Sequence, residues 1–273
     1  DFRAKKGEES FPVFTSSYES SPWRSPTSYH NLVDPNVWSK CFDLQLPEGR
    51  CIGLQLAQSD DIISPDFVEI DHNASHWIHT CLHPQEIRIA RERRSNSNSF
   101  ILGRLAMRHL ILTDQPILKD SYGRPVLPKE YLGTISHKDQ IGVAMVLQQQ
   151  NQKGRMGIGI DIERCMTKKR SIATKILTPN ELNDLGKLEH VSADEEVLLR
   201  FSLKEALYKA IHPLIHQFVG FQEAEVYPLN DGSAKLKWQI KSGVHTNFDA
   251  VTAHWRRLPN SDYFLTSGSV TLK

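Results

Sequence analysis

The sequence predicts an α+β protein. Segments in which apolar and polar residues alternate at the two-residue period of a strand occur in both halves of the chain, and stretches between them repeat apolar residues at helical spacing. Toward the C-terminus several alternating segments follow one another, which is typical of an antiparallel sheet. The chain has 273 residues, 24% of them charged and 39% hydrophobic, so it can form one large domain or two small ones.

The first half divides into an arm and a lobe. Residues 1–35 are rich in Ser, Pro and charged residues without a regular apolar period, so we expect an irregular N-terminal arm. In the lobe, residues 36–150, we expect a strand over 51–57, a helix from Pro84 to about Arg93, a second helix over Phe100–Leu112 after the polar break at 95–99, and a strand within 135–147. The polar connector at 148–155 marks the boundary to a second lobe, residues 151–273.

The second lobe begins with an alternating run at Gly157. Short helices are expected over 171–177 and 179–188, followed by a long helix from about Asp194 to Ile211, which contains no Gly or Pro. The remaining segments, 226–227, 234–240, 249–255 and 263–267, are predicted to be strands of an antiparallel sheet.

Charge and cysteine usage exclude several classes. The net charge is +1, from 33 basic and 32 acidic residues, so no global field would recruit nucleic acid or an anionic membrane. No apolar run approaches the roughly eighteen residues of a membrane-spanning helix. The four cysteines form no CxxC pair, which favours free thiols and a cytoplasmic location. Because the first residue is Asp rather than Met, an organellar location after loss of a targeting peptide stays open.

Two carboxylates are expected side by side on one strand. In the run Gly157-Ile-Gly-Ile-Asp-Ile-Glu163, alternation places Asp161 and Glu163 on one face and Ile160 and Ile162 on the other. A third carboxylate, Glu205, lies on the long helix, four residues before Lys209 and on the same helical face.

If the strand and the helix pack together, three acidic groups converge beside an ammonium group. Such a site suits Mg²⁺ and a phosphate, because Mg²⁺ binds a few carboxylates while phosphate oxygens and water complete its shell. We therefore predict Asp161, Glu163 and Glu205 as metal ligands, with Mn²⁺ as an alternative ion. If the segments do not meet, these residues are solvated surface charges and an ordinary helical Glu-Lys pair.

Four sequence blocks, in this order, resemble the 4'-phosphopantetheinyl transferase family. They are Gly103-Arg-Leu-Ala-Met-Arg108, Gly123-Arg-Pro125 followed by Ile135-Ser-His137, the Gly-Ile-Asp-Ile-Glu run ending at Glu163, and Phe201-Ser-Leu-Lys-Glu-Ala-Leu-Tyr-Lys209. Phe201 in place of Trp, together with the Gly-Arg block, is similar to the siderophore-synthase (EntD-like) branch of the larger, surfactin-type group. The resemblance covers roughly Leu82 to the C-terminus.

The resemblance implies two similar α/β lobes related by pseudo-twofold symmetry, with coenzyme A in the cleft between them. It further implies a Mg²⁺-dependent transferase, a holo-[acyl-carrier-protein] synthase, that moves the 4'-phosphopantetheine arm of coenzyme A to a serine of an apo acyl, peptidyl or aryl carrier protein. We expect a monomer, with Glu205 accepting the serine proton and Lys209 offsetting charge on the leaving phosphate.

The resemblance also points to residues that contact coenzyme A. They are Arg104, Arg108, Arg124, Ser136, His137, Lys204 and Lys209. His137 is implied at the 3'-phosphate, and Arg124, between Gly123 and Pro125, can present a rigid fork to a phosphate. Arg104 and Arg108 form a basic stripe one helical turn apart; some relatives carry a basic residue at the position of Ser99, for which Arg93 or Arg94 is the proposed substitute.

Other interpretations stay open at this stage. A metal-dependent phosphodiester hydrolase or a non-catalytic coenzyme A or nucleotide-binding protein would use the same residue types. His72, His76, His79 and His83, with Cys81 nearby, form an alternative transition-metal site. A carrier protein could dock on an apolar patch rimmed by cations, made of Ile172, Ile176, Leu177, Lys168, Lys169 and Arg170, unless its apolar residues pack the core.

Overall fold

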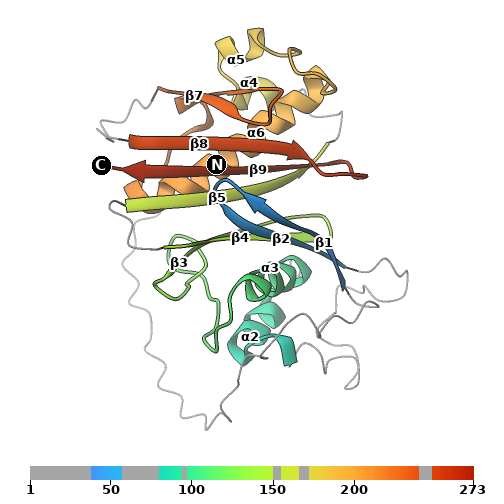
Figure 1. The fold of residues 1–273 in the computed structure, drawn as a ribbon, viewed down its shortest axis with the longest axis vertical. Helices are drawn as coiled ribbons and strands as arrows, with labels where there is room; N and C mark the ends of the chain where they lie inside the picture. The colour runs from blue at the N-terminus through green and yellow to red at the C-terminus, as the bar shows by residue number, and fades with distance from the viewer. Residues whose placement is uncertain (1–37, 57–79, 94–96, 150–154, 166–171, 240–247) are drawn as a thin grey trace.

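The computed structural model describes residues 38–56, 80–93, 97–149, 155–165, 172–239 and 248–273, and they form two stacked lobes (Figure 1). Each lobe combines an antiparallel sheet with helices, so the α+β class is confirmed. β4 (Ile141–Gln148) and β5 (Arg155–Arg164) lie on the two sides of the predicted lobe boundary. The predicted N-terminal arm lies outside the described residues.

The N-terminal lobe is a four-stranded antiparallel sheet with one helix packed on its face and a second helix packed against the first. Its strands run in the order β1 (Trp38–Leu46), β2 (Gly49–Leu56), β4 and β3 (Tyr131–Lys138). The helices are α2 (Pro84–Glu92) and α3 (Ser97–Leu110), and α3 packs closely because Gly142 lacks a side chain where Leu102 crosses the sheet. Apolar side chains from α2, α3 and the sheet form the core of this lobe.

Three details of this lobe differ from the prediction. β1 was not anticipated, because exposed and buried side chains alternate weakly along its sequence. The expected strand within 135–147 is a hairpin of β3 and β4, turning at Asp139, which adopts a left-handed conformation with φ of 50°. α3 starts at Ser97, inside the predicted polar break, because Ser97 is buried against the lobe.

The C-terminal lobe contains a three-stranded sheet in the order β5, β9 (Tyr263–Leu272) and β8 (Phe248–Arg257). The long helix α6 (Ala193–Ile215) crosses one face of this sheet. The smaller elements are α4 (Ala173–Ile176), α5 (Pro179–Asn183), η2 (Phe221–Glu223) and the two-stranded sheet of β6 (Ala224–Pro228) and β7 (Ala234–Trp238). The predicted single C-terminal sheet is therefore split, and the acidic strand β5 joins β9.

Helix α6 has clear start and stop signals. Ser192 accepts a hydrogen bond from Glu195 N while the Glu195 carboxylate accepts one from Ser192 N, which is a reciprocal capping box. At the other end, Pro213 lies in the last turn and His216 takes a left-handed conformation that ends the helix. The helix thus holds the Lys-Glu motif in its middle.

Two glycines of β5 bring α6 unusually close. A Cβ atom on Gly159 would lie 1.8 Å from the Ala206 carbonyl oxygen, and one on Gly157 would lie 2.0 Å from that of Ala210. Only glycine allows this approach of helix backbone to strand backbone. The Gly-x-Gly lead-in therefore sets the distance between the acidic strand and the Lys-Glu helix.

The two lobes meet along β3 and β5. Ile160 N donates a hydrogen bond to Thr134 Oγ1 across this seam, and an apolar cluster that includes Ile158, Ile160 and Ile162 packs against side chains of β2 and β4. The buried Glu48, from the β1–β2 turn, accepts hydrogen bonds from Thr252 and Ser267 of the other lobe. The lobes are thus joined by both apolar and polar contacts.

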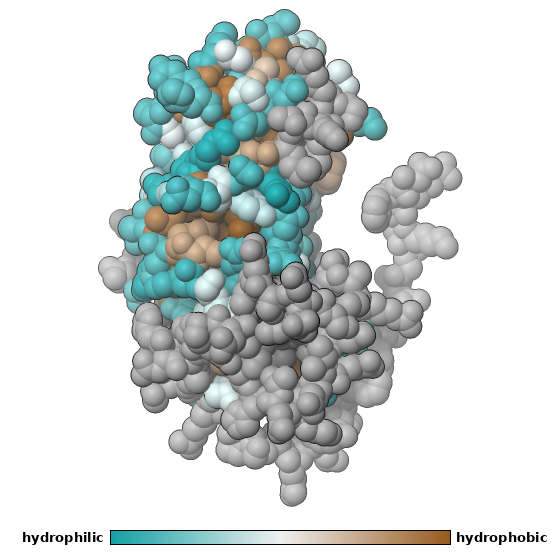
Figure 2. Space-filling model, turned by 90° about the vertical axis from the view of Figure 1, so that its right-hand side faces the viewer, coloured by the Kyte–Doolittle hydropathy of each residue, from teal (hydrophilic) through white to brown (hydrophobic). Residues whose placement is uncertain are grey.

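The described surface seen in Figure 2 is largely hydrophilic, with a compact hydrophobic area enclosed by polar side chains. Among the residues that the structure describes, no helix is both long and apolar enough to cross a membrane.

Candidate active site between the lobes

The two acids of β5 point toward α6, as the alternation predicts. Asp161 and Glu163 are 7% and 9% exposed, while Ile160 and Ile162 lie in the apolar cluster on the opposite face. Buried carboxylates require partners, because an unpaired buried charge is costly. The partners of these two acids differ.

Asp161 is held by both lobes. Its Oδ1 accepts hydrogen bonds from Ser136 Oγ and Lys209 Nζ, each at 2.8 Å, and its Oδ2 accepts one from Ser202 Oγ at 2.8 Å. Lys209 Nζ also donates to Ser136 Oγ at 3.1 Å and to the Ile160 carbonyl at 2.9 Å. Strand β3, strand β5 and helix α6 therefore meet at one carboxylate.

Glu205 lies within electrostatic reach of both acids on the strand. Partial burial raises the pKa of Glu205 first of all; the charges of Asp161 and Glu163 also raise it, and Lys209 opposes them. Three carboxylates from two distant segments thus share one neighbourhood. The helix and the strand meet as the metal-site hypothesis requires.

Glu163 faces a second lysine. Lys138 Nζ lies 2.7 Å from Glu163 Oε2, but this buried oxygen has no hydrogen-bond partner among the described residues. The short distance makes the contact an ion pair, and the poor alignment means that it is not also a well-directed hydrogen bond. Lys138 was not among the site residues predicted from the sequence.

A large cleft opens beside these acids. It has a volume of about 880 Å³ and is lined by β3, the 119–127 loop, β5 and the C-terminal half of α6. Its basic lining residues are Arg93, Arg104, Lys119, Arg124, His137, Arg155, Lys209 and His212, whereas its acidic lining residue is Asp120. The cleft therefore suits a ligand with several negative charges.

Arg104 is a buried cation with a free donor. It is 3% exposed, its Nε donates to the Ile117 carbonyl, and its guanidinium stacks 3.9 Å from the Phe100 ring centre. Its Nη2 is buried without a hydrogen-bond partner in the described structure. Desolvation lowers the pKa of Arg104 to about 10, so the group stays charged at neutral pH and can bind an anion.

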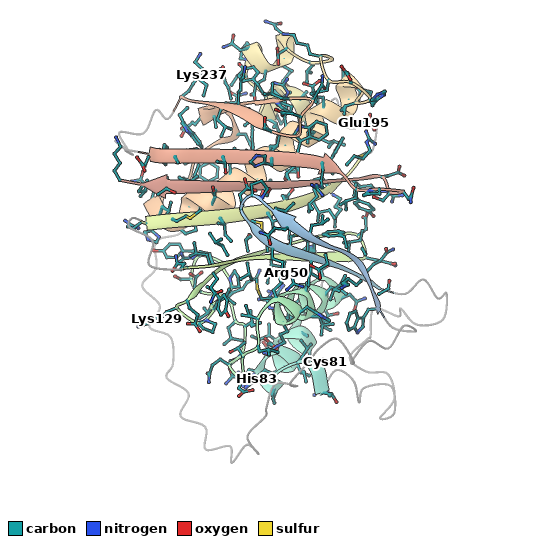
Figure 3. All side chains as sticks on the ribbon, viewed as in Figure 1. Arg50, Cys81, His83, Lys129, Glu195 and Lys237 are labelled. Atoms are coloured by element: carbon teal, nitrogen blue, oxygen red, sulfur yellow. The ribbon has the colours of Figure 1, made fainter. Side chains whose placement is uncertain are left out.

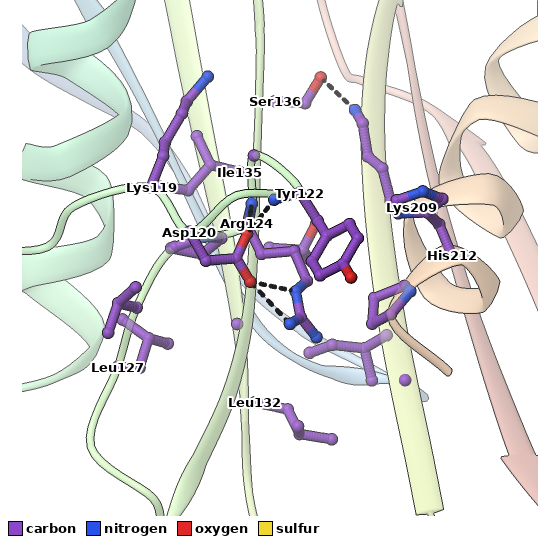
Figure 4. A pocket seen from close by; sticks show the side chains of 18 of the residues that line it. Lys119, Asp120, Tyr122, Arg124, Leu127, Leu132, Ile135, Ser136, Lys209 and His212 are labelled. Atoms are coloured by element: carbon purple, nitrogen blue, oxygen red, sulfur yellow. Dashed lines mark hydrogen bonds and ion pairs between the residues drawn. The ribbon is translucent and has the colours of Figure 1, made fainter. Parts of the chain in front are cut away.

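Arg124 is held in place by its own turn. The Asp120 carboxylate accepts hydrogen bonds from Arg124 N and Arg124 Nε, and Gly123 turns the chain at a φ of 84° (Figure 4). The Tyr122 ring contacts His212 of α6, with ring centres 5.5 Å apart. This turn places Arg124 at the mouth of the cleft, facing the other lobe.

His137 lies on β3 at the edge of the cleft and is exposed overall. Partial desolvation first, then the charges of Lys209 and Lys119, lower the pKa of His137, while Asp161 acts in the opposite direction. An arriving anion would offset the cationic neighbours and favour the protonated imidazole. His137 is thus suited to bind phosphate when the ligand is present.

The structure does not bring Arg108 and Lys204 into the cleft. Arg108 is fully buried, forms a two-pronged ion pair with Glu86, and donates to the Thr113 and Gln115 carbonyls. Lys204 Nζ contacts Glu181 at 2.6 Å and the carbonyls of Ile176 and Phe221. Arg108 lies one turn beyond Arg104 on α3 and is held by Glu86, and Lys204 lies on a different face of α6 from Lys209 and is held by Glu181.

Two other expectations fall partly outside the described residues. Lys168, Lys169, Arg170, His72, His76 and His79 all lie there. Ile176 and Leu177 are buried in an apolar cluster with Val197, as the core alternative holds. His83 caps α2 by accepting a hydrogen bond from Gln85 N, and Figure 3 shows it with Cys81 at the end of the N-terminal lobe, far from β5.

The donor set fits a hard cation in its chemistry. Asp161, Glu163 and Glu205 offer carboxylate oxygens, and Glu163 Oε2 is buried without a hydrogen bond from any described residue. As they stand, no three His, Cys, Asp or Glu side chains of the described residues are grouped closely enough to hold a metal ion. Lysines contact Asp161 and Glu163 in this structure, so the ligand set stays a prediction.

Some residues of the site were missed from the sequence. Ser202 and Lys138 contact the acidic side chains, and Thr266 contacts the Ser202 hydroxyl and the Asp161 backbone carbonyl. Lys119, Arg155, Tyr122 and His212 line the cleft. Ser202 lies inside the Lys-Glu block and Lys138 follows the Ser-His block, so their position in the sequence was a usable signal. The remaining residues come from the loop that holds Lys119 and Tyr122, from strands β5 and β9, and from the last turn of α6, and no local pattern marks them.

Comparisons with known proteins show the family of this chain. The sequence model of the 4'-phosphopantetheinyl transferase superfamily matches residues 157–265, and that of the 4'-phosphopantetheinyl transferase N-terminal domain matches residues 86–147. The chain is 30% identical over 158 residues to the 4'-phosphopantetheinyl transferase Npt of Nocardia iowensis, a match that covers 56% of this chain and 69% of Npt. It is 29% identical over 142 residues to the 4'-phosphopantetheinyl transferase PptT of Mycobacterium tuberculosis, covering 50% of this chain and 61% of PptT.

Solved structures include similar, shorter proteins. A holo-(acyl-carrier-protein) synthase from Bacillus anthracis in complex with CoA (3',5'-ADP) is 26% identical, with a TM-score of 0.35, and the match covers 44% of this chain and 100% of that chain. The family assignment itself depends on the sequence matches, which span both lobes. The chain therefore belongs to the 4'-phosphopantetheinyl transferase superfamily, and it is a transferase.

Proposed function

We propose that this chain transfers the 4'-phosphopantetheine arm of coenzyme A to a serine of an apo acyl, peptidyl or aryl carrier protein, in a Mg²⁺-dependent reaction. The observation that carries the proposal is the cationic cleft lined by Lys209, whose Nζ contacts Asp161 Oδ1 and lies within electrostatic reach of Glu205. The products are the holo-carrier and adenosine 3',5'-bisphosphate. The relatives' printed names and the coenzyme A complex of the Bacillus anthracis protein support the same substrates.

The charges of the cleft match those of coenzyme A, which carries a diphosphate and a separate 3'-phosphate. Arg104, whose Nη2 has no hydrogen-bond partner among the described residues, and His137, which lines the same cleft, are candidates for the 3'-phosphate. Lys209 lies next to the acids and is the candidate for the diphosphate. Arg124 lies at the cleft mouth, where it can contact the nucleotide from the side of the N-terminal lobe.

The reaction exchanges one phosphorus–oxygen bond for another. The carrier serine Oγ attacks the phosphorus atom that carries the pantetheine arm, the bond from that phosphorus to the bridging oxygen breaks, and the electron pair leaves with adenosine 3',5'-bisphosphate. The serine proton must be accepted as its oxygen becomes bonded to phosphorus. Positioning and charge neutralisation supply most of the rate in transfers of this kind.

Glu205 is the proposed proton acceptor. Its raised pKa keeps the carboxylate a better base than an ordinary exposed glutamate, and its place on α6 next to Asp161 puts it near the phosphate site. Asp161, Glu163 and Glu205 would hold the Mg²⁺, which when bound polarises the phosphate oxygens. Lys209 offsets negative charge on the leaving phosphate.

A second cavity adjoins the site. It has a volume of about 190 Å³, is mostly apolar, and is lined by Glu205, Tyr208, Phe218 and Trp238 among others. Tyr208 lines this cavity and the cationic cleft as well. The proposed diphosphate position therefore lies between a polar space suited to the nucleotide and an apolar space suited to the pantetheine arm.

The finer assignments follow from the same features. Residues from both lobes of one chain line the cleft, so a single chain can form the whole site. This arrangement supports a monomer, and it supports membership of the larger, surfactin-type group. Phe201 and the Gly103-Arg104 step support the siderophore-synthase branch. The cytoplasmic location stays a prediction from cysteine usage.

A transfer assay tests the proposal. The chain is incubated with fluorescent coenzyme A, Mg²⁺ and a panel of apo carrier proteins, and the carriers are analysed by mass spectrometry. We expect one or more carriers to gain the labelled arm on serine, and Glu205→Gln to reduce the rate by at least about 100-fold.

The exposed Glu130 provides the matched control, because Glu130→Gln makes the same chemical change far from the acids and should leave the rate unchanged. Failure to label any carrier while coenzyme A binds would favour a non-catalytic binding protein. Release of free 4'-phosphopantetheine without a carrier would identify a phosphodiester hydrolase instead.

A further inference from the structure

Each acid of β5 is already paired with a lysine. Lys209 Nζ lies 2.8 Å from Asp161 Oδ1, and Lys138 Nζ lies 2.7 Å from Glu163 Oε2. Lys209 belongs to the Lys-Glu block and has a role in the proposed reaction. The proposed reaction leaves Lys138 without a role.

The pairing follows from the equal spacing of these residues on β3 and β5, two adjacent strands of different sheets. Ser136 and Lys138 are two residues apart on β3, so their side chains lie on the same face, and Asp161 and Glu163 have the same relation on β5. Ser136 Oγ donates to Asp161, and Lys138 reaches Glu163 one step further along. The contact is thus built into the seam between the lobes.

Another cation can replace Lys138 as the partner of Glu163. The Lys138 side chain is 28% exposed, so it can swing toward water on its flexible stem, whereas that of Glu163 is 12% exposed. Glu163 Oε2 receives no hydrogen bond from a described residue, so nothing else is seen to hold this oxygen. A buried carboxylate oxygen with only a movable cation beside it can accept another cation when the lysine leaves.

We propose that Lys138 is a positioning residue that competes with the divalent cation for Glu163. It neutralises Glu163 when the metal is absent and thereby sets the metal concentration at which the site fills. This inference rests on the proposed function, because it takes Asp161 and Glu163 as metal ligands. Competition by lysine explains why Asp161, Glu163 and Glu205 are neighbours although no three described donors are close enough to hold a metal ion.

Direct metal binding tests the inference. Mn²⁺ is titrated into the full chain by isothermal calorimetry, with and without coenzyme A, and Mg²⁺ competition is followed by the electron paramagnetic resonance signal of free Mn²⁺. We expect Lys138→Met and Lys138→Gln to bind Mn²⁺ roughly tenfold more tightly than the wild type, as expected for loss of a partly buried competing charge. Lys138→Arg keeps the cation and should bind as the wild type does.

Lys40 supplies the matched control. It forms an exposed pair with Asp43 on β1, so Lys40→Met removes the same side chain from the same lobe and should leave Mn²⁺ affinity unchanged. Unchanged or weaker binding by both folded Lys138 variants would overturn the inference. Asp161→Asn separates this failure from that of the proposed function, because wild-type Mn²⁺ binding by Asp161→Asn would show that the metal site itself is misplaced.

Discussion

Two lysines of one motif have different environments at the residue scale. Lys204 and Lys209 both match the Lys-Glu block, yet Lys204 is buried against Glu181 and two backbone carbonyls, whereas Lys209 faces Asp161 and the cleft. The two lysines are five residues apart, which is more than one full turn of the helix, so their side chains lie on different faces. A lysine in a motif therefore acquires its role from the face on which it lies.

Glu205 illustrates a cost of function. Desolvation first, and then Asp161 and Glu163, raise the pKa of Glu205, so the folded protein binds this proton more tightly than the unfolded chain. Stability from this group is therefore present at low pH and declines as pH rises from the ordinary glutamate pKa through the raised one. Above that range the charged carboxylate destabilises the fold.

We therefore predict opposite effects of Glu205→Gln on stability and on activity. Without metal, the melting temperature of the variant should exceed that of the wild type at pH 7.5, and the difference should shrink below the ordinary pKa of glutamate. The wild-type transfer rate should fall as pH drops through the raised pKa of Glu205. Scanning calorimetry and a pH–rate profile measure the two effects; a variant less stable than the wild type at pH 7.5 would contradict this account.

The spacing between β5 and α6 governs the site at the scale of elements. Asp161 lies on the strand and Glu205 and Lys209 on the helix, and the glycines of β5 let the two backbones touch. A strand with side chains at these positions would hold the helix farther away. The Lys209–Asp161 contact would then be lost even though both residues remained.

Gly159→Ala tests this spacing. The added Cβ would overlap the Ala206 carbonyl, so we expect the free energy of unfolding to fall by about 3 kcal/mol and transfer to fall strongly. Gly220→Ala is the matched control for the free energy of unfolding alone, because its Cβ would make an ordinary contact of 3.8 Å with the Phe218 ring but would lie in the apolar cavity. Urea denaturation compares the two variants, and the transfer assay is applied to Gly159→Ala. Equal losses of stability in the two variants would show that close backbone packing is not what positions the site.

At the scale of the whole molecule, the cleft exists only because two lobes are held together. Glu48 is a buried polar link between them: it accepts hydrogen bonds from Thr252 Oγ1 at 2.8 Å and Ser267 Oγ at 2.7 Å, and it lies 2.6 Å from His254 Nδ1. The carboxylate comes from the β1–β2 turn and its partners from β8 and β9. The seam therefore depends on a charge with three partners.

Glu48→Gln should weaken this seam. The amide carries no charge, and its NH2 group would face a hydroxyl group that donates a hydrogen bond in the wild type. We therefore expect a loss of about 1–3 kcal/mol in the free energy of unfolding. Asp43→Asn is the control, since it breaks an exposed pair with Arg50 that is worth less than about 1 kcal/mol. Urea denaturation compares the two variants. Equal losses in the free energy of unfolding would show that the buried Glu48 contacts stabilise the fold no more than an exposed ion pair does.

Local pattern predicted much of the fold. The Gly-x-Gly lead-in, the acidic strand, both helices of the N-terminal lobe and the long helix follow from spacing and capping signals, and all are present. β1 and the division of the C-terminal strands were missed, because pairing partners are chosen by residues far away in the sequence. The roles of the motif residues stay predictions; the structure brings Asp161, Ser136 and Lys209 together, whereas Arg108 and Lys204 pair with acids inside their lobes.

The sequence by itself determined the chemistry available, because alternation on a strand and periodicity on a helix place Asp161 beside Glu163 and Glu205 beside Lys209 whatever the rest of the chain does. Only the tertiary structure decided which cations serve the cleft. Arg104 reaches it while Arg108, one turn later, is bound to Glu86, and Lys138 reaches Glu163 from the other lobe. The reason is physical: the role of a charged side chain depends on the neighbours that desolvate or neutralise it, and folding brings those neighbours from distant segments.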